Sequence, residues 1–291
     1  MNDRTSSGAV FEVRRYPVPG GIAVTADVGG DPRHPAVILT HGGGQTRHSW
    51  HGAMRELIAQ GYHVINLDAR GHGDSDWSPD GVYSVELLSD DLKAVIATLP
   101  NAPALVGASM GGITSLHAVG TSDRRIASAL ILVDVVPRVE ATGGAKIMAF
   151  MRARPEGFAN LEEAADAVAA YNPHRPRPRD ISGLMKNLRL REDGRLHWHW
   201  DPRFLSMDPP EPPIVTERLL EAAARVREPT LVVRGLQSDI VSEAGIEEFR
   251  RYLPTLEVFD VPGAGHMVAG DRNDAFNQGV TDFLRRHHPA R

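Results

Sequence analysis

The sequence predicts an α/β fold, with a mostly parallel sheet of eight strands, helices on both faces, and a mainly helical cap inserted after the sixth strand. Short apolar runs alternate with amphipathic segments, which is typical of right-handed βαβ units in a sheet covered on both faces. The alternation breaks off after Pro137 and resumes near residue 214. We therefore expect residues 1–137 and 214–291 to form the core and residues 138–213 to form the cap.

The first elements belong to the edge and centre of the predicted sheet. Residues 10–16 and 22–28 are expected to form a hairpin, because the segment 17–21 between them is rich in proline and glycine. Residues 36–40 form a short apolar run that ends at His41 and three glycines. Such a run indicates a buried strand.

The next elements repeat the helix and strand pattern. Residues 50–59 are predicted to be helical because Met54, Leu57 and Ile58 share one face. We expect strands at 63–67, 104–106 and 129–136, and helices at 85–99 and 110–119.

The cap region has no strong strand. Residues 161–171 are predicted to be a helix, residues 172–179 are too rich in proline for regular structure, and residues 188–200 are predicted to form a hairpin that turns at Asp193-Gly194. Residues 208–213 resemble a stiff linker. The sheet then resumes, with strands expected at 230–233 and 256–261 and helices at 246–252 and 273–286.

Composition narrows the class of function. There are 32 Lys and Arg against 37 Asp and Glu, a net charge of −5, which argues against nucleic-acid and anionic-membrane binding. Cysteine is absent, so disulfides, thiolate metal sites and cysteine nucleophiles are excluded. The polar start of the chain and the lack of a long apolar stretch lead us to expect a cytoplasmic protein. The expected partner is a small molecule, and self-association is left open.

The segment Gly107 to Gly112 contains the pattern G-x-S-x-G between a predicted strand and a predicted helix. This is the context of a nucleophile elbow, in which a sharp turn exposes the serine and leaves no room for side chains beside it. The helix that follows directs its amide groups toward the serine oxygen. Ser109 is therefore the candidate nucleophile.

A serine nucleophile needs a base and an acid that orients the base. His266 follows the last predicted strand and Asp239 follows the strand before it, so both lie at the same sheet edge as Ser109. We expect His266 to be the base and Asp239 the acid. Asp134, at the end of the strand before the cap, is the alternative acid.

The candidate oxyanion hole is the run His41-Gly42-Gly43-Gly44 after the third strand. Its backbone N–H groups are unhindered and lie at the same edge. We assign the two donors to the backbone N–H groups of Gly43 and Met110, with Gly44 as the alternative to Gly43. A donor of this kind is worth about 3 kcal/mol in the barrier.

Taken together, these motifs resemble the α/β-hydrolase fold family, over nearly the whole chain. The matching segments are His41 to Gly43, Asp68 to Ser75, Gly107 to Gly112, Asp239 and His266. The segment from Pro262 to Val268 is similar to the branch that holds cofactor-free haloperoxidases, small esterases, lactonases and epoxide hydrolases. Epoxide hydrolases use an aspartate nucleophile, whereas this chain has Ser109. The resemblance also implies that Asp68 and Arg70 hold a turn and are not catalytic.

The pocket lining is the least specific part of the prediction. We expect Gly44, Trp50, Met151, Trp198 and Met267 to contact the substrate, although packing in the core or cap explains the large side chains equally well. We considered a metal site at the two histidines of the segment 197–200. No acidic third ligand is evident, and zinc needs at least three protein ligands. No metal or organic cofactor is therefore expected.

These features predict a serine hydrolase of small carboxylic esters or lactones that works through an acyl-enzyme on Ser109. The same residues also suit perhydrolysis, as in cofactor-free haloperoxidases, or cleavage of a carbon–carbon bond in a diketone. A third reading is a ligand receptor built on a hydrolase scaffold, because the fold alone does not establish the function.

Overall fold

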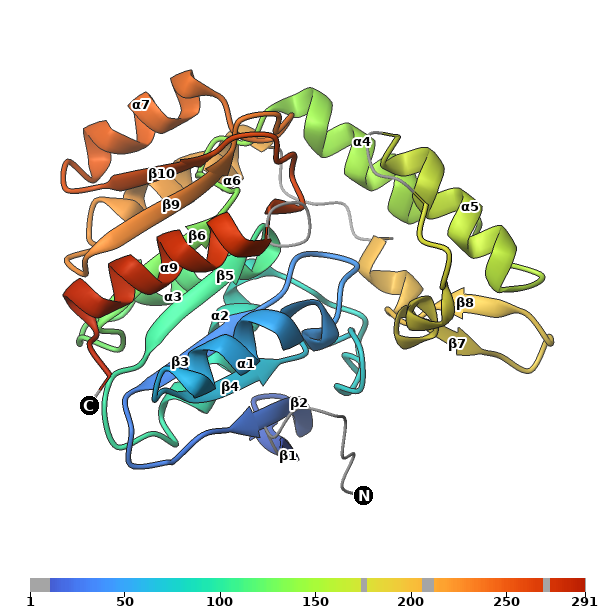
Figure 1. Ribbon diagram of the computed structural model, residues 1–291, viewed down its shortest axis with the longest axis horizontal. Coiled ribbons are helices and arrows are strands. Elements are labelled where there is room, and N and C mark those ends of the chain that lie inside the picture. Colours follow the sequence, from blue (N-terminus) through green and yellow to red (C-terminus); the bar gives the residue numbers. More distant parts are fainter. Residues whose placement is uncertain (1–10, 174–176, 206–211, 269–272, 291) are drawn as a thin grey trace.

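The computed structural model describes residues 11–173, 177–205, 212–268 and 273–290. Its main feature is a sheet of eight strands in the order β1-β2-β4-β3-β5-β6-β9-β10 (Figure 1). The strands are β1 (Glu12–Val18), β2 (Ile22–Gly29), β3 (Ala36–Thr40), β4 (His63–Leu67), β5 (Ala104–Ala108), β6 (Ala129–Val133), β9 (Thr230–Gly235) and β10 (Glu257–Val261).

The sheet is mostly parallel, as predicted. β1 pairs with β2, and β2 with β4, in antiparallel register, while all other neighbours are parallel. The carboxyl ends of the parallel strands therefore meet at one edge. β1 extends to Val18 and includes Pro17, which the sequence analysis placed in the turn. Proline is tolerated there because β1 is an edge strand.

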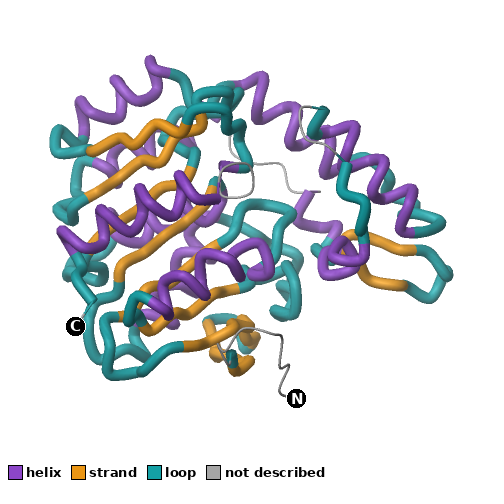
Figure 2. The backbone as a smooth tube through the Cα atoms, viewed as in Figure 1, coloured by secondary structure: helices purple, strands orange, loops and turns teal. Residues whose placement is uncertain are grey.

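Helices cover both faces of the sheet (Figure 2). One face carries α1 (His51–Ala59) and α9 (Asn273–His287), and the other carries α2 (Val85–Ile96), α3 (Met110–Gly120), α6 (Pro212–Ala223) and α7 (Glu243–Tyr252). Side chains alternate between the two cores: Ile38 of β3 packs on the side of α2 and α3, whereas Val37 and Leu39 pack on the side of α1 and α9. Among the described helices, none is long and apolar enough for a membrane crossing.

The segment between β6 and α6 stands beside the sheet in Figure 1. It contains α4 (Ala141–Arg152), α5 (Leu161–Tyr171), η2 (Ser182–Asn187), β7 (Leu188–Leu190), β8 (Leu196–Trp198) and η3 (Pro202–Leu205). β7 and β8 form the expected hairpin, and Gly194 turns it with a φ of +76°. A small core of its own contains Phe158, Ala164 and Leu188. This arrangement supports the predicted cap, and its exact boundaries stay a prediction.

Two features of this segment differ from the sequence analysis. α4 was not predicted, because its alanines and glycines give little apolar periodicity; Gly143 is required there because a β-carbon would lie 2.1 Å from the Asp239 carbonyl oxygen. The predicted linker 208–213 lies mostly outside the described residues. Its last two residues, Pro212 and Pro213, begin α6, where proline is tolerated in the first turn.

Candidate active site

Ser109 lies in the turn between β5 and α3. Its backbone has φ 47° and ψ −115°, a strained conformation of the kind found in functional turns. Glycines make the turn sterically feasible. A β-carbon on Gly107 would lie 2.4 Å from the Gly111 carbonyl oxygen, and one on Gly111 would lie 2.5 Å from that of Thr40. α3 can therefore begin directly after β5, with Ser109 half-buried at the carboxyl edge of the sheet.

His266 follows β10 and contacts Asp134. Its Nδ1 lies 2.8 Å from Oδ2 of Asp134, and the Asp134 side chain is fully buried. Asp134 also accepts a hydrogen bond from the Gly235 N–H at 3.0 Å and one from the Ser238 hydroxyl. Because an ionised carboxylate can only accept, Nδ1 of His266 must donate to it. This arrangement leaves Nε2 of His266 as the nitrogen available to act as a base.

The expected pairing of Asp239 with His266 is wrong. The Asp239 side chain is 43% exposed and forms an ion pair with Lys146 of α4 at 3.0 Å. Asp239 lies four residues beyond the end of β9, and the chain has turned outward by then. Asp134 directly follows β6, the neighbour of β9 in the sheet, and therefore points into the interior beside His266.

The loop after β3 brings three glycines next to the serine. A β-carbon on Gly42 would lie 3.4 Å from the β-carbon of Ser109. The Gly44 N–H donates to Nε2 of His72 at 3.2 Å, so it already has a partner. In the part of the chain that the structure describes, the Gly43 N–H has none. Of the two alternatives for the first oxyanion donor, Gly43 is the one that remains available.

The second candidate donor is the N–H of Met110. Met110 is the first residue of α3, and the first N–H groups of a helix have no partner within the helix. The positive end of the helix dipole lies at the same point. The Met110 N–H, directly after Ser109 in the chain, therefore stays the second candidate donor beside that of Gly43.

Three buried histidines, His41, His72 and His199, contact the backbone of the glycine loop. We call these three residues the histidine brace. Nδ1 of His41 donates to the Gly42 carbonyl at 2.8 Å. His72 accepts the Gly44 N–H, and Nε2 of His199 lies 3.4 Å from the Gly44 carbonyl. The glycine loop, which has little stiffness of its own, is thus positioned by side chains from the residue after β3, from the loop after β4 and from the cap.

The histidine brace is neutral at neutral pH. Burial lowers the pKa of His72 to about 3, lowers the pKa of His41, and holds the pKa of His199 well below its usual value. Each neutral ring can accept a hydrogen bond on one nitrogen and donate on the other. The backbone N–H of Ala69 donates to His41 at 3.0 Å, and that of Gly73 donates to His199 at 2.7 Å.

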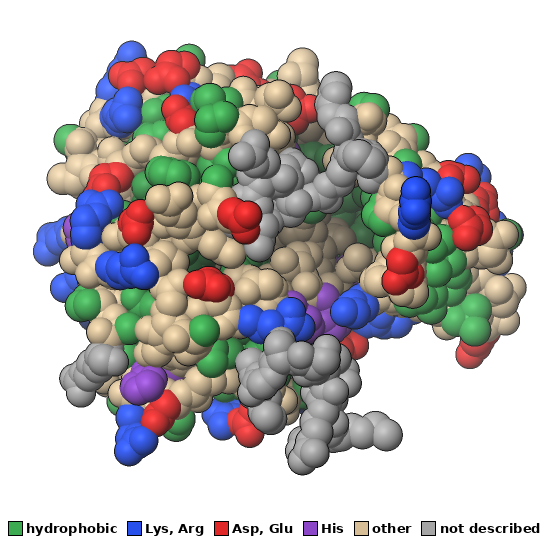
Figure 3. Space-filling model, viewed as in Figure 1, with side chains coloured by type: hydrophobic (Ala, Val, Ile, Leu, Met, Phe, Trp, Pro, Cys, Tyr) green, Lys and Arg blue, Asp and Glu red, His purple; other side chains and the backbone are tan. Residues whose placement is uncertain are grey.

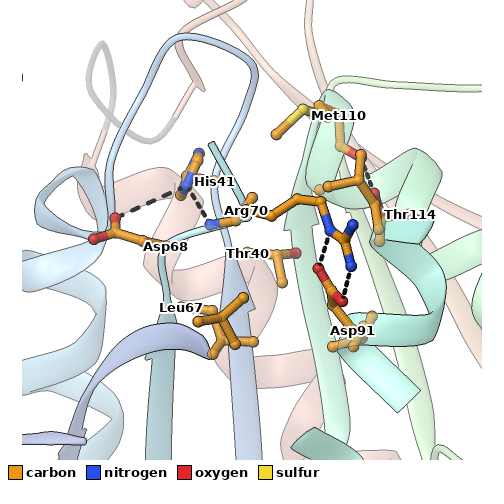
Figure 4. Close-up of a pocket in the computed structure, with 13 residues that line it drawn as sticks. Thr40, His41, Leu67, Asp68, Arg70, Asp91, Met110 and Thr114 are labelled. Atoms are coloured by element: carbon orange, nitrogen blue, oxygen red, sulfur yellow. Dashed lines mark hydrogen bonds and ion pairs between the residues drawn. The ribbon is translucent and has the colours of Figure 1, made fainter. Parts of the chain in front are cut away.

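Asp68 and Arg70 stabilise the turn after β4, as the close-up of this region shows (Figure 4). Arg70 forms a bidentate ion pair with buried Asp91 of α2, and Asp68 accepts from the Arg47 backbone at 2.7 Å. A cavity of about 30 Å³ lies beneath the elbow, lined in part by Arg70, Asp91 and Met110. It has room for a water molecule but not for an ester. These residues are structural, in agreement with the resemblance.

The side of the site that faces the cap is apolar. Met151 of α4 lies close to the glycine loop. A β-carbon added to Gly44 would be 3.2 Å from Cε of Met151. Trp200 lies equally close to that position, and Trp198 stacks on Trp200 with ring centroids 5.1 Å apart. Met267 accepts a hydrogen bond from Gln45 at its sulfur. Figure 3 shows a hollow between the core and the cap at this side of the molecule.

Two further expectations are resolved by the packing. Trp50 is only 2% exposed and packs against Phe276 in the core between α1 and α9, so its assignment to the substrate pocket is wrong. Its position directly before α1, on the apolar face of that helix, is the reason. His197 pairs with Asp193 at 2.7 Å, and His199 belongs to the histidine brace, so these two residues do not share a metal site.

Comparisons with known proteins agree with this geometry. A family model described as alpha/beta hydrolase fold matches residues 35–272. The chain belongs to the alpha/beta hydrolase fold family. It is 30% identical to the sn-1-specific diacylglycerol lipase ABHD11 of Mus musculus over 267 residues, which are 88% of this chain and 82% of that protein. It is also 30% identical to Esterase Rv0045c of Mycobacterium tuberculosis over 286 residues, 96% of this chain and 91% of the relative.

A solved structure of E-2-(acetamidomethylene)succinate hydrolase is similar as well. The TM-score is 0.83 at 25% identity, and the match covers 94% of this chain and 99% of the other. The predicted fold class and family are thereby confirmed, and the relatives are esterases and other hydrolases. Within this alpha/beta hydrolase, sequence reasoning missed Ser238 as a partner of Asp134. Ser238 occupies no motif, so only the packing reveals its contact.

Proposed function

We propose that this alpha/beta hydrolase cleaves small carboxylic esters or lactones through an acyl-enzyme on Ser109. The observation that carries the proposal is the contact between His266 and the fully buried Asp134, at the same sheet edge as the strained turn of Ser109. The esterases among its relatives support the same reaction class. The acid in this proposal is Asp134, not Asp239.

The reaction begins when Nε2 of His266 takes the hydroxyl proton of Ser109 while the serine oxygen attacks the substrate carbonyl. The N–H groups of Gly43 and Met110 donate to the oxygen that becomes negative. His266 then gives its proton to the departing alkoxide, and the carbon–oxygen bond of the ester breaks. Water, deprotonated by His266, attacks the acyl-enzyme in the same way, and the carboxylic acid and Ser109 are released.

Asp134 serves His266 in two ways. Its carboxylate holds the proton on Nδ1, so that Nε2 is free to accept one, and its charge stabilises the imidazolium that forms. The hydrogen bonds from Gly235 and Ser238 stabilise the charged form of this buried carboxylate. A buried polar group needs hydrogen-bond partners of this kind, because burial without them is costly.

The apolar wall of the hollow indicates the kind of substrate. Met151 and Trp200 present thioether and indole surface to the glycine loop, Trp198 stacks on Trp200, and none of the three carries a charge. Burial of an apolar acyl or alkoxy group there stabilises the bound substrate by about 25 cal/mol per Å² of apolar surface. The substrate is a small molecule, and the lack of cysteine suits a reducing cytoplasm as the place of action.

A fluorophosphonate probe followed by intact-mass analysis and peptide mapping tests the proposal. We expect one adduct, on Ser109, and none in Ser109→Ala. Turnover of p-nitrophenyl esters should fall in that variant by a factor on the order of 10⁶, and it should rise from acetate to longer acyl chains in the parent protein. Undiminished turnover in folded Ser109→Ala would overturn the proposal.

A further inference from the structure

Asp27, His48 and His51 bring three ligand atoms together away from Ser109. They lie on β2, on η1 (Arg47–Trp50) and at the start of α1. Nε2 of His51 is 2.7 Å from Oδ2 of Asp27 and 3.4 Å from Nδ1 of His48, and all three atoms lie within 4.8 Å of one another. The function proposed above uses none of the three residues.

These separations are close to those of a metal site. Nitrogen and carboxylate ligands lie about 2.0–2.2 Å from Zn²⁺ in tetrahedral geometry, which places neighbouring ligand atoms about 3.4 Å apart. The two histidines already have this spacing. Asp27 needs to withdraw from His51 by roughly 0.7 Å, from 2.7 Å to about 3.4 Å, for the ion to enter between them. The His51 side chain is 20% exposed, so an ion and a water ligand can reach the site.

The ligand set suits a cation. Nδ1 of His48 and Oδ2 of Asp27 both lie next to Nε2 of His51, so each residue offers one ligand atom to a shared ion. The site therefore offers two imidazoles and one carboxylate, a ligand set that binds zinc-like ions.

The surrounding charges do not exclude a cation. Arg47 bonds to Oδ1 of Asp27, which leaves Oδ2 for the ion, and its Nη1 faces Asp68 and Asp74. Arg189 pairs with Asp74 from the cap. Three carboxylates against two guanidinium groups leave a local charge of −1, which a divalent ion can offset.

We propose that Asp27, His48 and His51 form a binding site for a divalent transition-metal ion of the Zn²⁺ class. The ion takes the place of the hydrogen bond between His51 and Asp27, and a water completes the coordination. The bound metal links β2 to η1 and α1, directly after the glycine loop. Its role is to stabilise this part of the fold, and ester cleavage does not require it.

The test uses tag-free protein, stripped with EDTA, and Co²⁺ as the probe. We expect one equivalent of Co²⁺ to bind, with the visible absorption of a tetrahedral or five-coordinate complex. Zn²⁺ should raise the Tm of the parent protein by several degrees.

Substitutions inside and outside the cluster test whether the ion binds at Asp27, His48 and His51. His48→Gln/His51→Gln should lose Co²⁺ binding and the Zn²⁺ shift while keeping its esterase activity in EDTA. If that pair fails to fold, His48→Gln alone should bind at least tenfold more weakly. His266→Gln and His34→Gln, which lie outside the cluster, should keep the full stoichiometry. Equal binding by parent and double variant, loss of binding in His266→Gln, or no binding by the parent at millimolar Co²⁺ would overturn the proposal.

Discussion

Asp134 and Asp239 follow neighbouring strands of the same sheet, yet their surroundings are opposite. Asp134 is fully buried, has a positive φ of 49°, and accepts hydrogen bonds from Gly235, Ser238 and His266. Asp239 is 43% exposed and has Lys146 as its partner. One carboxylate is enclosed by donors that need it ionised, and the other is a solvated member of a surface ion pair.

The contrast shows why position along a strand is a weak guide to a catalytic acid. Residues that follow parallel strands reach the same edge, but the turn of each loop decides which side chains point inward. Ser238, three residues beyond β9, contacts Asp134, whereas the next residue, Asp239, points outward. An exposed pair such as Asp239–Lys146 contributes little, about 0–1 kcal/mol, because water and salt screen it. A buried carboxylate that orients an imidazole affects the reaction barrier directly.

The largest expected effect comes from Asp134→Asn. The amide would present an N–H to His266 and favour the wrong tautomer, so kcat should fall by about 10⁴ with little change in KM. The measurement is steady-state hydrolysis of a p-nitrophenyl ester, with circular dichroism as the check on folding. A loss below tenfold in a folded variant would contradict the assignment of Asp134.

The histidine brace provides the next test, because it positions the glycine loop through buried neutral groups. His72→Phe removes the acceptor of the Gly44 N–H, and kcat should fall by about 10- to 100-fold, less than a whole oxyanion donor costs. His72→Gln, whose side-chain oxygen can accept the same hydrogen bond, should recover much of the loss. An equal fall in both variants would indicate a packing role only.

A smaller effect is expected from Ser238→Ala, which removes one of the three donors to Asp134. A charge-assisted hydrogen bond is worth about 1.5 kcal/mol, so kcat should fall by roughly tenfold. Steady-state hydrolysis of a p-nitrophenyl ester by the variant and the parent protein measures this fall. An unchanged kcat would mean that Ser238 only supports the loop.

Stability should depend on pH through the histidine brace. These rings have folded-state pKa values below the unfolded value near 6.5, so the unfolded chain binds more protons below that pH. The stability they contribute is complete above pH 6.5 and is lost as the pH falls toward 4. Tm should therefore decline over this window, and less steeply in His72→Gln. A flat Tm between pH 7 and 4.5 would contradict buried neutral histidines.

The smallest effects are expected at the exposed ion pair of Asp239 and Lys146. Asp239→Asn and Lys146→Met should each leave kcat within about twofold of the parent value and change stability by less than 1 kcal/mol. The two variants are assayed beside Asp134→Asn, under the same conditions. A loss of several hundredfold in Asp239→Asn would reverse the assignment of the acid.

The sequence by itself determined the family, the alternation of strands and helices, and the candidates Ser109, His266 and Gly43. These follow from local rules: apolar periodicity marks the strands, and a serine between glycines at a strand-to-helix turn needs only its neighbours in the chain. The hairpin at Gly194 was predictable for the same reason. α4 was not, because its small residues are helical through packing against the Asp239 backbone.

Only the tertiary structure distinguished Asp134 from Asp239, placed Trp50 in the core, and joined His41, His72 and His199 into one brace. Each of these depends on contacts between segments far apart in the chain, such as the 132 residues between Asp134 and His266. Burial and hydrogen-bond partners arise when β6, β9, β10 and the cap come together. The residue pattern of one segment does not show which of its side chains a distant segment will bury.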